Sequence, residues 1–400
     1  MPSTLTWVDH DATARERSLR ILSLFQEKES RDELGLGSVR DAFADRLFPG
    51  TSTIQTRLRY MLFAPWIYTR LENERVSFAE ISARVRKAEV ALIDALKESD
   101  DKDGIFGKQA GRALQRLPSA IYWAGLGAWG IRRFDGSQDE YHRALDGLYT
   151  RRGHAARRKQ DGDESEADPA LVTWHPRVPP PPDGFPEGAS FALTREEADF
   201  LLDRIATSQK DSLLAHLALR CKPAESAFPW EHPEHAGFST PHREVLDHAR
   251  LFSEVMHGAA LLYNLALAEV AKRDELREEH RANLAAWTKG LDHAGVRGWS
   301  LPRLWELTFD QGHTISSTTR TFVRAWVELT AGKPEALAED THAKLLVERR
   351  ERTLKGARSR FTNARSRDQW GGYAGTARLA YRWPTVRTFL EDLHAGRRGR

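Results

Sequence analysis

The sequence has one cysteine, Cys221, and few β-branched residues, and both shortages restrict what the protein can be. A single cysteine excludes a disulfide framework and a cysteine-rich zinc site, and it fits a reducing compartment. Leucine occurs 45 times against 10 isoleucines and 15 valines, a ratio that favours helices over sheet. Because no run of eighteen apolar residues occurs and residues 1–11 hold no apolar leader core, we expect a cytoplasmic protein without a membrane span.

Glycine-rich phosphate-binding loops are also absent from the sequence. The Gly35-Leu36-Gly37 segment lacks the third glycine of a dinucleotide-binding motif, and no GxxxxGK[ST] motif occurs anywhere. We therefore expect neither ATP hydrolysis nor a bound cofactor.

Helix start signals recur along the chain, each followed by apolar residues at helical spacing. Thr194 with Glu197 is typical of a capping box. In this motif the side chain of the first residue bonds to the backbone N–H of the residue three positions later, and the side chain of that later residue bonds back to the backbone N–H of the first. Ser239 precedes a segment, about 242–272, that is apolar on nearly every side and that we interpret as a buried central helix. No two-residue hairpin signal joins alternating segments, so the sequence predicts an all-α fold.

The segment 151–190 interrupts the helical pattern. Its charge changes from basic to acidic before a run of four prolines at 179–182. Such a composition buries little apolar surface and favours an extended chain, while Trp174 is suited to anchor the segment on a folded body. We therefore predict two helical lobes, an N-terminal domain over 1–150 and a C-terminal domain over 191–400, joined by a charged, proline-rich linker or long loop.

Positive charge is concentrated at the C-terminal end. Residues 349–400 hold fourteen arginines and lysines against four acids, a net charge of +10, whereas the whole chain carries +3. Thirteen of the fourteen are arginine, which favours bidentate contacts to phosphate or carboxylate, and aromatic residues alternate with them. This pattern is typical of a nucleic-acid interface, and the alternative is a solvated helical face whose aromatic residues pack inward. The candidate binding residues are Arg349, Arg350, Arg352, Lys355, Arg358, Arg360, Arg365, Arg367, Arg378 and Arg382.

A second candidate site follows the turn at 47–50, where we expect one helix to end and Thr51 or Ser52 to cap the next. Backbone N–H groups at helix N-termini bind anions. The residues placed for such an anion-binding corner are Thr51, Ser52, Thr53, Gln55 and Arg57. The alternative is an ordinary turn with capping residues.

Metal and acid–base chemistry have weaker signals. His232, His235, His242 and His248 form the densest histidine cluster, but their spacing matches no standard zinc pattern, so we expect no metal site. Asp41 belongs to a group of acids that alternate with arginines near the N-terminus, which favours ion pairs over a catalytic centre.

Several blocks of sequence carry a family resemblance. The first are Thr6-Trp7-Val8-Asp9, then residues 31–43, which open Arg-Asp-Glu-Leu-Gly, and residues 47–57, which open Leu-Phe-Pro-Gly-Thr-Ser. Later blocks lie at 121–131 and 381–383. Together they resemble a family of bacterial proteins defined only as a domain of unknown function, over most of the chain. The resemblance implies no catalytic residue, but it implies partners among helicase and nuclease genes in antiphage-defence neighbourhoods.

We therefore expect a non-catalytic component of a bacterial nucleic-acid-handling, antiphage system. Its C-terminal arginines would hold nucleic-acid backbone while its helical body docks a helicase or nuclease partner. Two alternatives stay open. One is a metal-dependent nuclease of unrecognised type that uses the acid-rich N-terminal region, and the other is a scaffold without nucleic-acid contact, whose arginines pair with an acidic partner.

Overall fold

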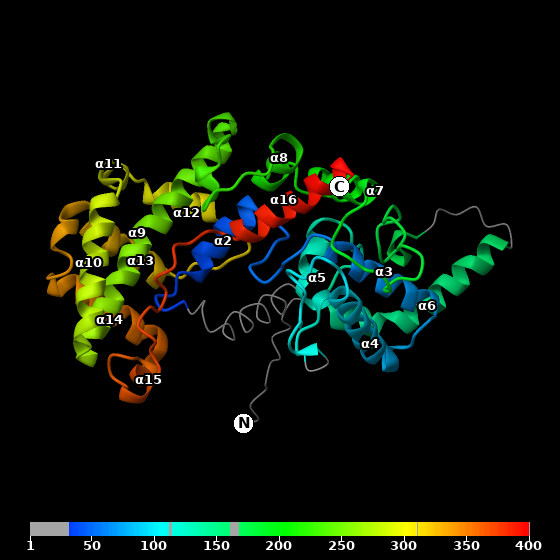
Figure 1. Ribbon diagram of the computed structural model, residues 1–400, viewed down its shortest axis with the longest axis horizontal. Coiled ribbons are helices and arrows are strands. Elements are labelled where there is room, and N and C mark those ends of the chain that lie inside the picture. The colour runs from blue at the N-terminus through cyan, green and yellow to red at the C-terminus, as the bar shows by residue number, and fades with distance from the viewer. Residues whose placement is uncertain (1–31, 112–113, 161–167, 310, 400) are drawn as a thin grey trace, which may run out of the picture. The chain divides into compact units, whose positions relative to one another are not determined.

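The computed structural model describes residues 32–399 except 112–113, 161–167 and 310 (Figure 1). Over these residues the chain is all-α, as the sequence predicts: helices and short 3-10 turns alternate with loops, and β-pairing is limited to one isolated bridge between Arg132 and Trp174. The opening Thr6–Asp9 block of the family resemblance lies outside the described residues.

The chain folds into two compact units that are each assembled from separate stretches of sequence. Unit 1 comprises the described residues of Phe48–Glu225 and 382–399, and unit 2 comprises 32–47 and Ser226–Tyr381. The predicted boundaries at residues 150 and 190 both fall inside unit 1. The predicted arrangement of two lobes about a linker stays a prediction.

Unit 1 is built around an aromatic core. Tyr60 and Tyr122 pack at a centroid distance of 5.3 Å, and Tyr68 packs edge-on against Tyr141 at 5.3 Å. The helices of unit 1 are α3 (Tyr60–Asn73), α4 (Phe78–Lys97), α5 (Pro118–Ala128), α6 (Gln138–Gln160), α7 (Arg195–Ser208), α8 (Leu213–Arg220) and α16 (Trp383–Arg398). The C-terminal helix α16 packs against α7 and α8.

The segment after α6 packs onto unit 1. Trp174 is buried and its indole N–H donates to the Glu72 carboxylate at 2.9 Å, so it anchors the chain there. The four-proline run follows, and the Pro179 carbonyl accepts from the Trp66 indole at 2.6 Å. These contacts give the proline-rich segment a defined path.

Unit 2 is organised around one long helix, α9 (Thr240–Ala271), which contacts α2, α10, α13 and α14. Ser239 caps it through the His242 N–H, and its middle is buried, as predicted. By length and composition α9 could cross a membrane, but 89% of its most apolar window is buried, as in the core helix of a folded unit. The other helices are α2 (Gly37–Leu47), α10 (Asp274–Gly290), α11 (His293–Arg297), α12 (Leu301–Thr308), α13 (Ser317–Gly332), α14 (Thr341–Lys355) and α15 (Ala364–Asp368).

The observed helix starts agree with one predicted capping signal and disagree with another. Thr194 and Glu197 form the predicted capping box at α7, with both hydrogen bonds present. The expected helix start at Thr51 or Ser52 is wrong, because α3 begins at Tyr60. Tertiary hydrogen bonds hold the chain before Tyr60 as a loop, which outweighs the local capping preference.

Candidate nucleic-acid interface and ligand groove

The predicted basic residues separate into buried structural groups and exposed ones. Arg350, at the C-terminal end of α14, is only 6% exposed and its guanidinium donates to the Leu34 and Gly35 carbonyls at 2.8 and 3.0 Å. It also donates to the Thr319 hydroxyl at 2.8 Å. Arg350 therefore joins α13, α14 and the loop before α2 within unit 2.

The Glu33 carboxylate pairs with two more of these residues. Arg360 pairs with the Glu33 carboxylate at 2.9 Å and donates to the Tyr263 hydroxyl at 3.1 Å, and it is buried. Lys355 contacts the same carboxylate and lies 3.4 Å from Glu351. Carboxylates of unit 2 therefore engage both side chains.

Arg367 and Arg382 hold backbone carbonyls. Arg367 donates to the carbonyls of Arg360 and Phe361 at 2.9 and 3.2 Å. Arg382 is buried in unit 1, where it donates to the Thr51 carbonyl at 2.7 Å. Carbonyl partners satisfy the N–H groups of Arg367 without supplying a negative charge.

Four predicted residues form an exposed set that we name the arginine cluster: Arg349, Arg352, Arg358 and Arg365. Arg352 pairs with Glu348 at 3.3 Å. The side chains of Arg349, Arg358 and Arg365 make no ion pair or hydrogen bond within the described part of the chain.

The surroundings of the arginine cluster stay positively charged. Residues 348–368 carry eight basic and three acidic side chains, a net charge of +5. Asp32 and Glu33, from the segment before α2, lower it to +3. Internal pairing therefore leaves an excess of positive charge around α14 and α15.

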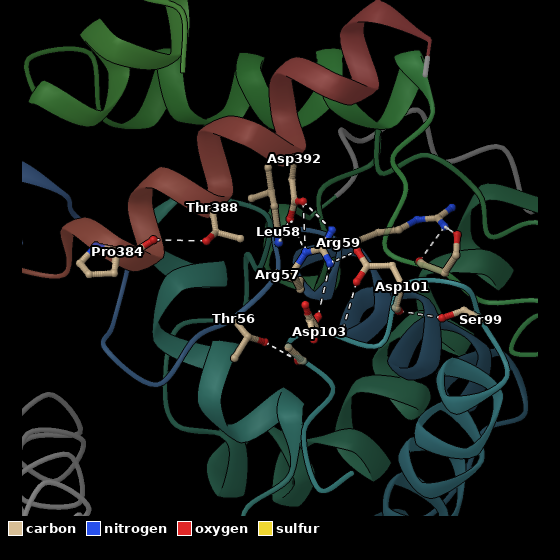
Figure 2. A network of polar contacts seen from close by, with 12 residues as sticks. Thr56, Arg57, Leu58, Arg59, Ser99, Asp101, Asp103, Pro384, Thr388 and Asp392 are labelled. Carbon is tan, nitrogen blue, oxygen red and sulfur yellow. Dashed lines mark hydrogen bonds and ion pairs between the residues drawn. The ribbon is translucent and has the colours of Figure 1, made fainter. Parts of the chain in front are cut away.

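The predicted anion-binding corner lies in unit 1, and its cation is already paired. The Arg57 guanidinium donates to the Asp392 carboxylate of α16 at 2.7 Å and contacts the Asp101 carboxylate (Figure 2). It also lies over the Phe191 ring, 4.6 Å from its centroid. Burial lowers the pKa of Arg57, but the two carboxylates outweigh burial and the net shift is upward, so Arg57 works as a structural ion-pair partner.

The other corner residues bond to the loop itself. The Thr51 hydroxyl donates to the Phe48 carbonyl at 2.6 Å, and the Gln55 side-chain oxygen accepts from the Ser52 N–H at 2.9 Å. Thr53 is exposed. These residues close a loop and do not form a helix N-terminus.

Unit 2 contains a groove of about 520 Å³ that lies against α9, α10 and the loop before Tyr381. Side chains at helical spacing on α10 form one side, and side chains one turn apart on α9 form another. The polar lining residues are Glu254, His257, Glu279, His280, Asn283, Tyr373, Thr376 and Arg378.

Two imidazoles in the groove carry unused nitrogens. His280 is fully buried, and its Nε2 lies 2.8 Å from the Gly372 carbonyl. A carbonyl only accepts, so Nε2 holds a proton. In the neutral imidazole Nδ1 is then a lone-pair acceptor, and it is buried without a partner. The Nδ1 atom of His257 is likewise buried and unpartnered. Burial lowers the pKa of His257, and the charge of Arg378 lowers it further.

Aromatic side chains border the same groove. The Trp287 indole donates to the Glu254 carbonyl at 2.8 Å and lies against Gly258, where a Cβ would sit 2.2 Å from the ring. Tyr373 is 51% exposed, and its hydroxyl donates to the Glu279 carboxylate at 2.7 Å. Gly258 therefore provides the space that places the Trp287 ring in the wall.

Arg378 is the one predicted basic residue that lines this groove, among the described residues. It pairs with Glu254 at 3.2 Å, and its guanidinium carbon lies 4.3 Å from the Phe228 ring centroid. Its Nε is buried without an acceptor. Arg378, His257 and His280 thus each bring one buried polar nitrogen without a partner to the lining of the groove.

His248, from the histidine cluster, and Asp41, from the acidic N-terminal residues, have structural partners. The His248 Nδ1 accepts from the Trp299 indole at 3.0 Å. Asp41 pairs with Arg40 at 3.0 Å. Across the described ranges, no group of three or more His, Cys, Asp or Glu side chains is placed to hold a metal ion.

Sequence reasoning missed His257 and His280, although one signal was present. Polar and aromatic residues recur on α10 at 280, 283 and 287, a helical stripe that faces the groove. Its pairing with His257 requires the antiparallel packing of α9 and α10, which local spacing does not reveal.

These features define an all-α protein with an exposed arginine cluster and a polar groove. The model of a family of unknown function, DUF6361, matches residues 2–396, and the chain belongs to that family. Neither a curated protein nor a solved structure matches it.

Proposed function

We propose that the protein binds the phosphate backbone of a nucleic acid through the arginine cluster. The observation that supports this most strongly is the exposure of Arg349, Arg358 and Arg365, which have no ion-pair or hydrogen-bond partner among the residues that the structure describes. Neighbouring basic residues, in contrast, are bound inside unit 2. Arginine presents a planar set of donors that matches phosphate oxygens, so free arginines on one stretch of chain suit a polyanion.

The buried arginines support the cluster electrostatically. Arg350 and Arg367 donate to neutral carbonyls and hydroxyls, so their charges add to the potential around α14 and α15. Backbone recognition of this kind is governed by charge and not by base sequence. We therefore expect binding that depends strongly on salt.

The test is fluorescence anisotropy of the full-length protein with labelled double-stranded DNA, single-stranded DNA and RNA at several salt concentrations. The variant reverses three exposed charges, Arg349→Glu, Arg358→Glu and Arg365→Glu. We expect it to weaken binding at least tenfold at low salt and to flatten the salt dependence.

A matched control reverses three other exposed arginines that pair with carboxylates in unit 1: Arg84→Glu, Arg143→Glu and Arg195→Glu. It changes net charge by the same amount, so a general charge effect would weaken both triple variants equally. Equal weakening, or no binding by the natural protein at low salt, would overturn the proposal. The scaffold alternative, in which the arginines pair with an acidic protein, would then take its place.

The proposal assigns no catalysis to the protein. Docking of a helicase or nuclease partner and a role in antiphage defence are parts of the proposal that rest on the family resemblance. Asp41, the residue that would test the nuclease alternative, is an ion-pair partner of Arg40 in α2, and no observation on the described residues favours that alternative.

A further inference from the structure

We propose that the groove against α9 and α10 holds one unstacked base of a single-stranded nucleic acid. This inference rests on the proposed function, since the arginine cluster would hold the backbone of the same strand. The groove and the cluster both belong to unit 2, where the chain passes from Arg365 in α15 to Arg378 in the groove through one short loop.

The first argument is the set of unused polar atoms. The Nδ1 lone pair of His280 requires a donor, the buried Nε of Arg378 requires an acceptor, and the buried Nδ1 of His257 has no partner of either kind. Leaving such groups buried and unpaired is unfavourable, so a ligand that satisfies them gains binding energy. The edge of a nucleobase carries donors and acceptors side by side, whereas a metal ion, an amine or a phosphate supplies only one kind.

Charge in the groove also favours a neutral ligand. Glu254 is shared between Arg378 and Arg250, at 3.2 and 3.0 Å, so its charge is balanced. Glu279 adds one carboxylate at the rim, where the Tyr373 hydroxyl already binds it. A simple anion or cation thus meets no uncompensated charge deep in the groove.

The walls suit a flat aromatic ligand. Trp287 and Tyr373 border the groove, and Leu261 and Leu291 add apolar surface. Base–aromatic stacking tolerates any base sequence, which fits a protein that binds the charged phosphate backbone. A cavity of about 520 Å³ has room for one base and part of its sugar.

The first experiment tests base binding without phosphate. Saturation-transfer difference NMR of the full-length protein with adenosine, guanosine, cytidine and uridine reports which ligand protons touch the protein. We expect saturation of base protons by the natural protein and its loss in Ala286→Trp, which fills the groove from an exposed position on α10. Ala285→Trp, on the same helix but outside the groove lining, is the matched control and should keep the signal.

The outcomes separate this inference from the proposed function. Nucleosides carry no phosphate, so the triple arginine variant should keep their signal even though it loses the strand. Absence of base signals with the natural protein, or signals that persist in Ala286→Trp, would overturn the base site while leaving backbone binding untouched.

The second experiment identifies the source of the base. Anisotropy with a single-stranded oligonucleotide and its abasic counterpart keeps the phosphates constant and removes only the bases. We expect the natural protein to prefer the intact strand by about tenfold and Ala286→Trp to lose that preference. Equal affinity for the two strands would contradict a base supplied by the strand, even where free nucleosides bind.

Discussion

Asp392 and Arg57 are 335 positions apart in the sequence, yet their side chains form the buried ion pair that fixes α16 in unit 1 (Figure 2). The same carboxylate accepts from the Leu58 backbone N–H at 2.9 Å. Asp392 thereby ties the C-terminal helix to the loop that precedes α3.

We predict that Asp392→Ala lowers the free energy of unfolding by about 3 kcal/mol, because it leaves Arg57 largely buried beside only one remaining carboxylate. Asp101→Ala is the control. Its carboxylate is 48% exposed, so the loss should be below about 1 kcal/mol. Urea denaturation of both variants measures the difference, and equal losses would show that Asp392 has no special role.

The neighbours Arg349 and Arg350 should behave in opposite ways. Arg350→Ala removes the donors to the Leu34 and Gly35 carbonyls, and we expect a loss of about 2–4 kcal/mol in the free energy of unfolding. Arg349→Ala removes an exposed side chain and should change it by less than about 0.5 kcal/mol. Thermal and urea unfolding of the two variants test this, and a stable Arg350→Ala protein would contradict its structural role.

Gly258 is expected to tolerate no side chain. Gly258→Ala places a Cβ 2.2 Å from the Trp287 ring, so the clash should outweigh the gain in helix propensity of about 1 kcal/mol and give a net loss. Gly290→Ala on α10 meets no atom within 4 Å and should be neutral or slightly stabilising. Urea unfolding compares the two variants.

Glu89 should make unit 1 less stable as pH rises. Burial raises the pKa of Glu89 to about 7, although hydrogen bonds from the Ser119 N–H and hydroxyl oppose the shift. Between pH 4.5 and 7 the unfolded chain has released this proton and the folded chain still holds it, so stability falls with pH.

The matching variant is Glu89→Gln, which keeps the shape and cannot ionise. We expect its stability relative to the natural protein to improve by about 2–3 kcal/mol between pH 5 and pH 8. Urea unfolding at the two pH values measures this change, and a pH-independent difference between the two proteins would contradict a raised pKa.

Local sequence signals were sufficient to predict a helix where only residues close together in the sequence are involved. Thr194 with Glu197 and the buried run after Ser239 act through neighbours a few residues away, and both produced the predicted helices. Thr51 and Ser52 failed as a helix start because the loop bonds elsewhere: the Thr51 carbonyl accepts from Arg382, and the Tyr122 hydroxyl donates to the Arg57 carbonyl at 2.8 Å. These contacts join residues that lie from 65 to more than 300 positions apart in the sequence.

The sequence by itself determined the helical class, the central helix and the concentration of arginine near the C-terminus, since composition and short-range periodicity encode these. Only the tertiary structure decided which arginines are available. Arg360 is neutralised by Glu33, 327 positions away, whereas Arg358 two residues earlier stays exposed. The tertiary structure also brought His257 and His280 into one groove. Burial and pairing depend on which distant surfaces meet when the chain packs.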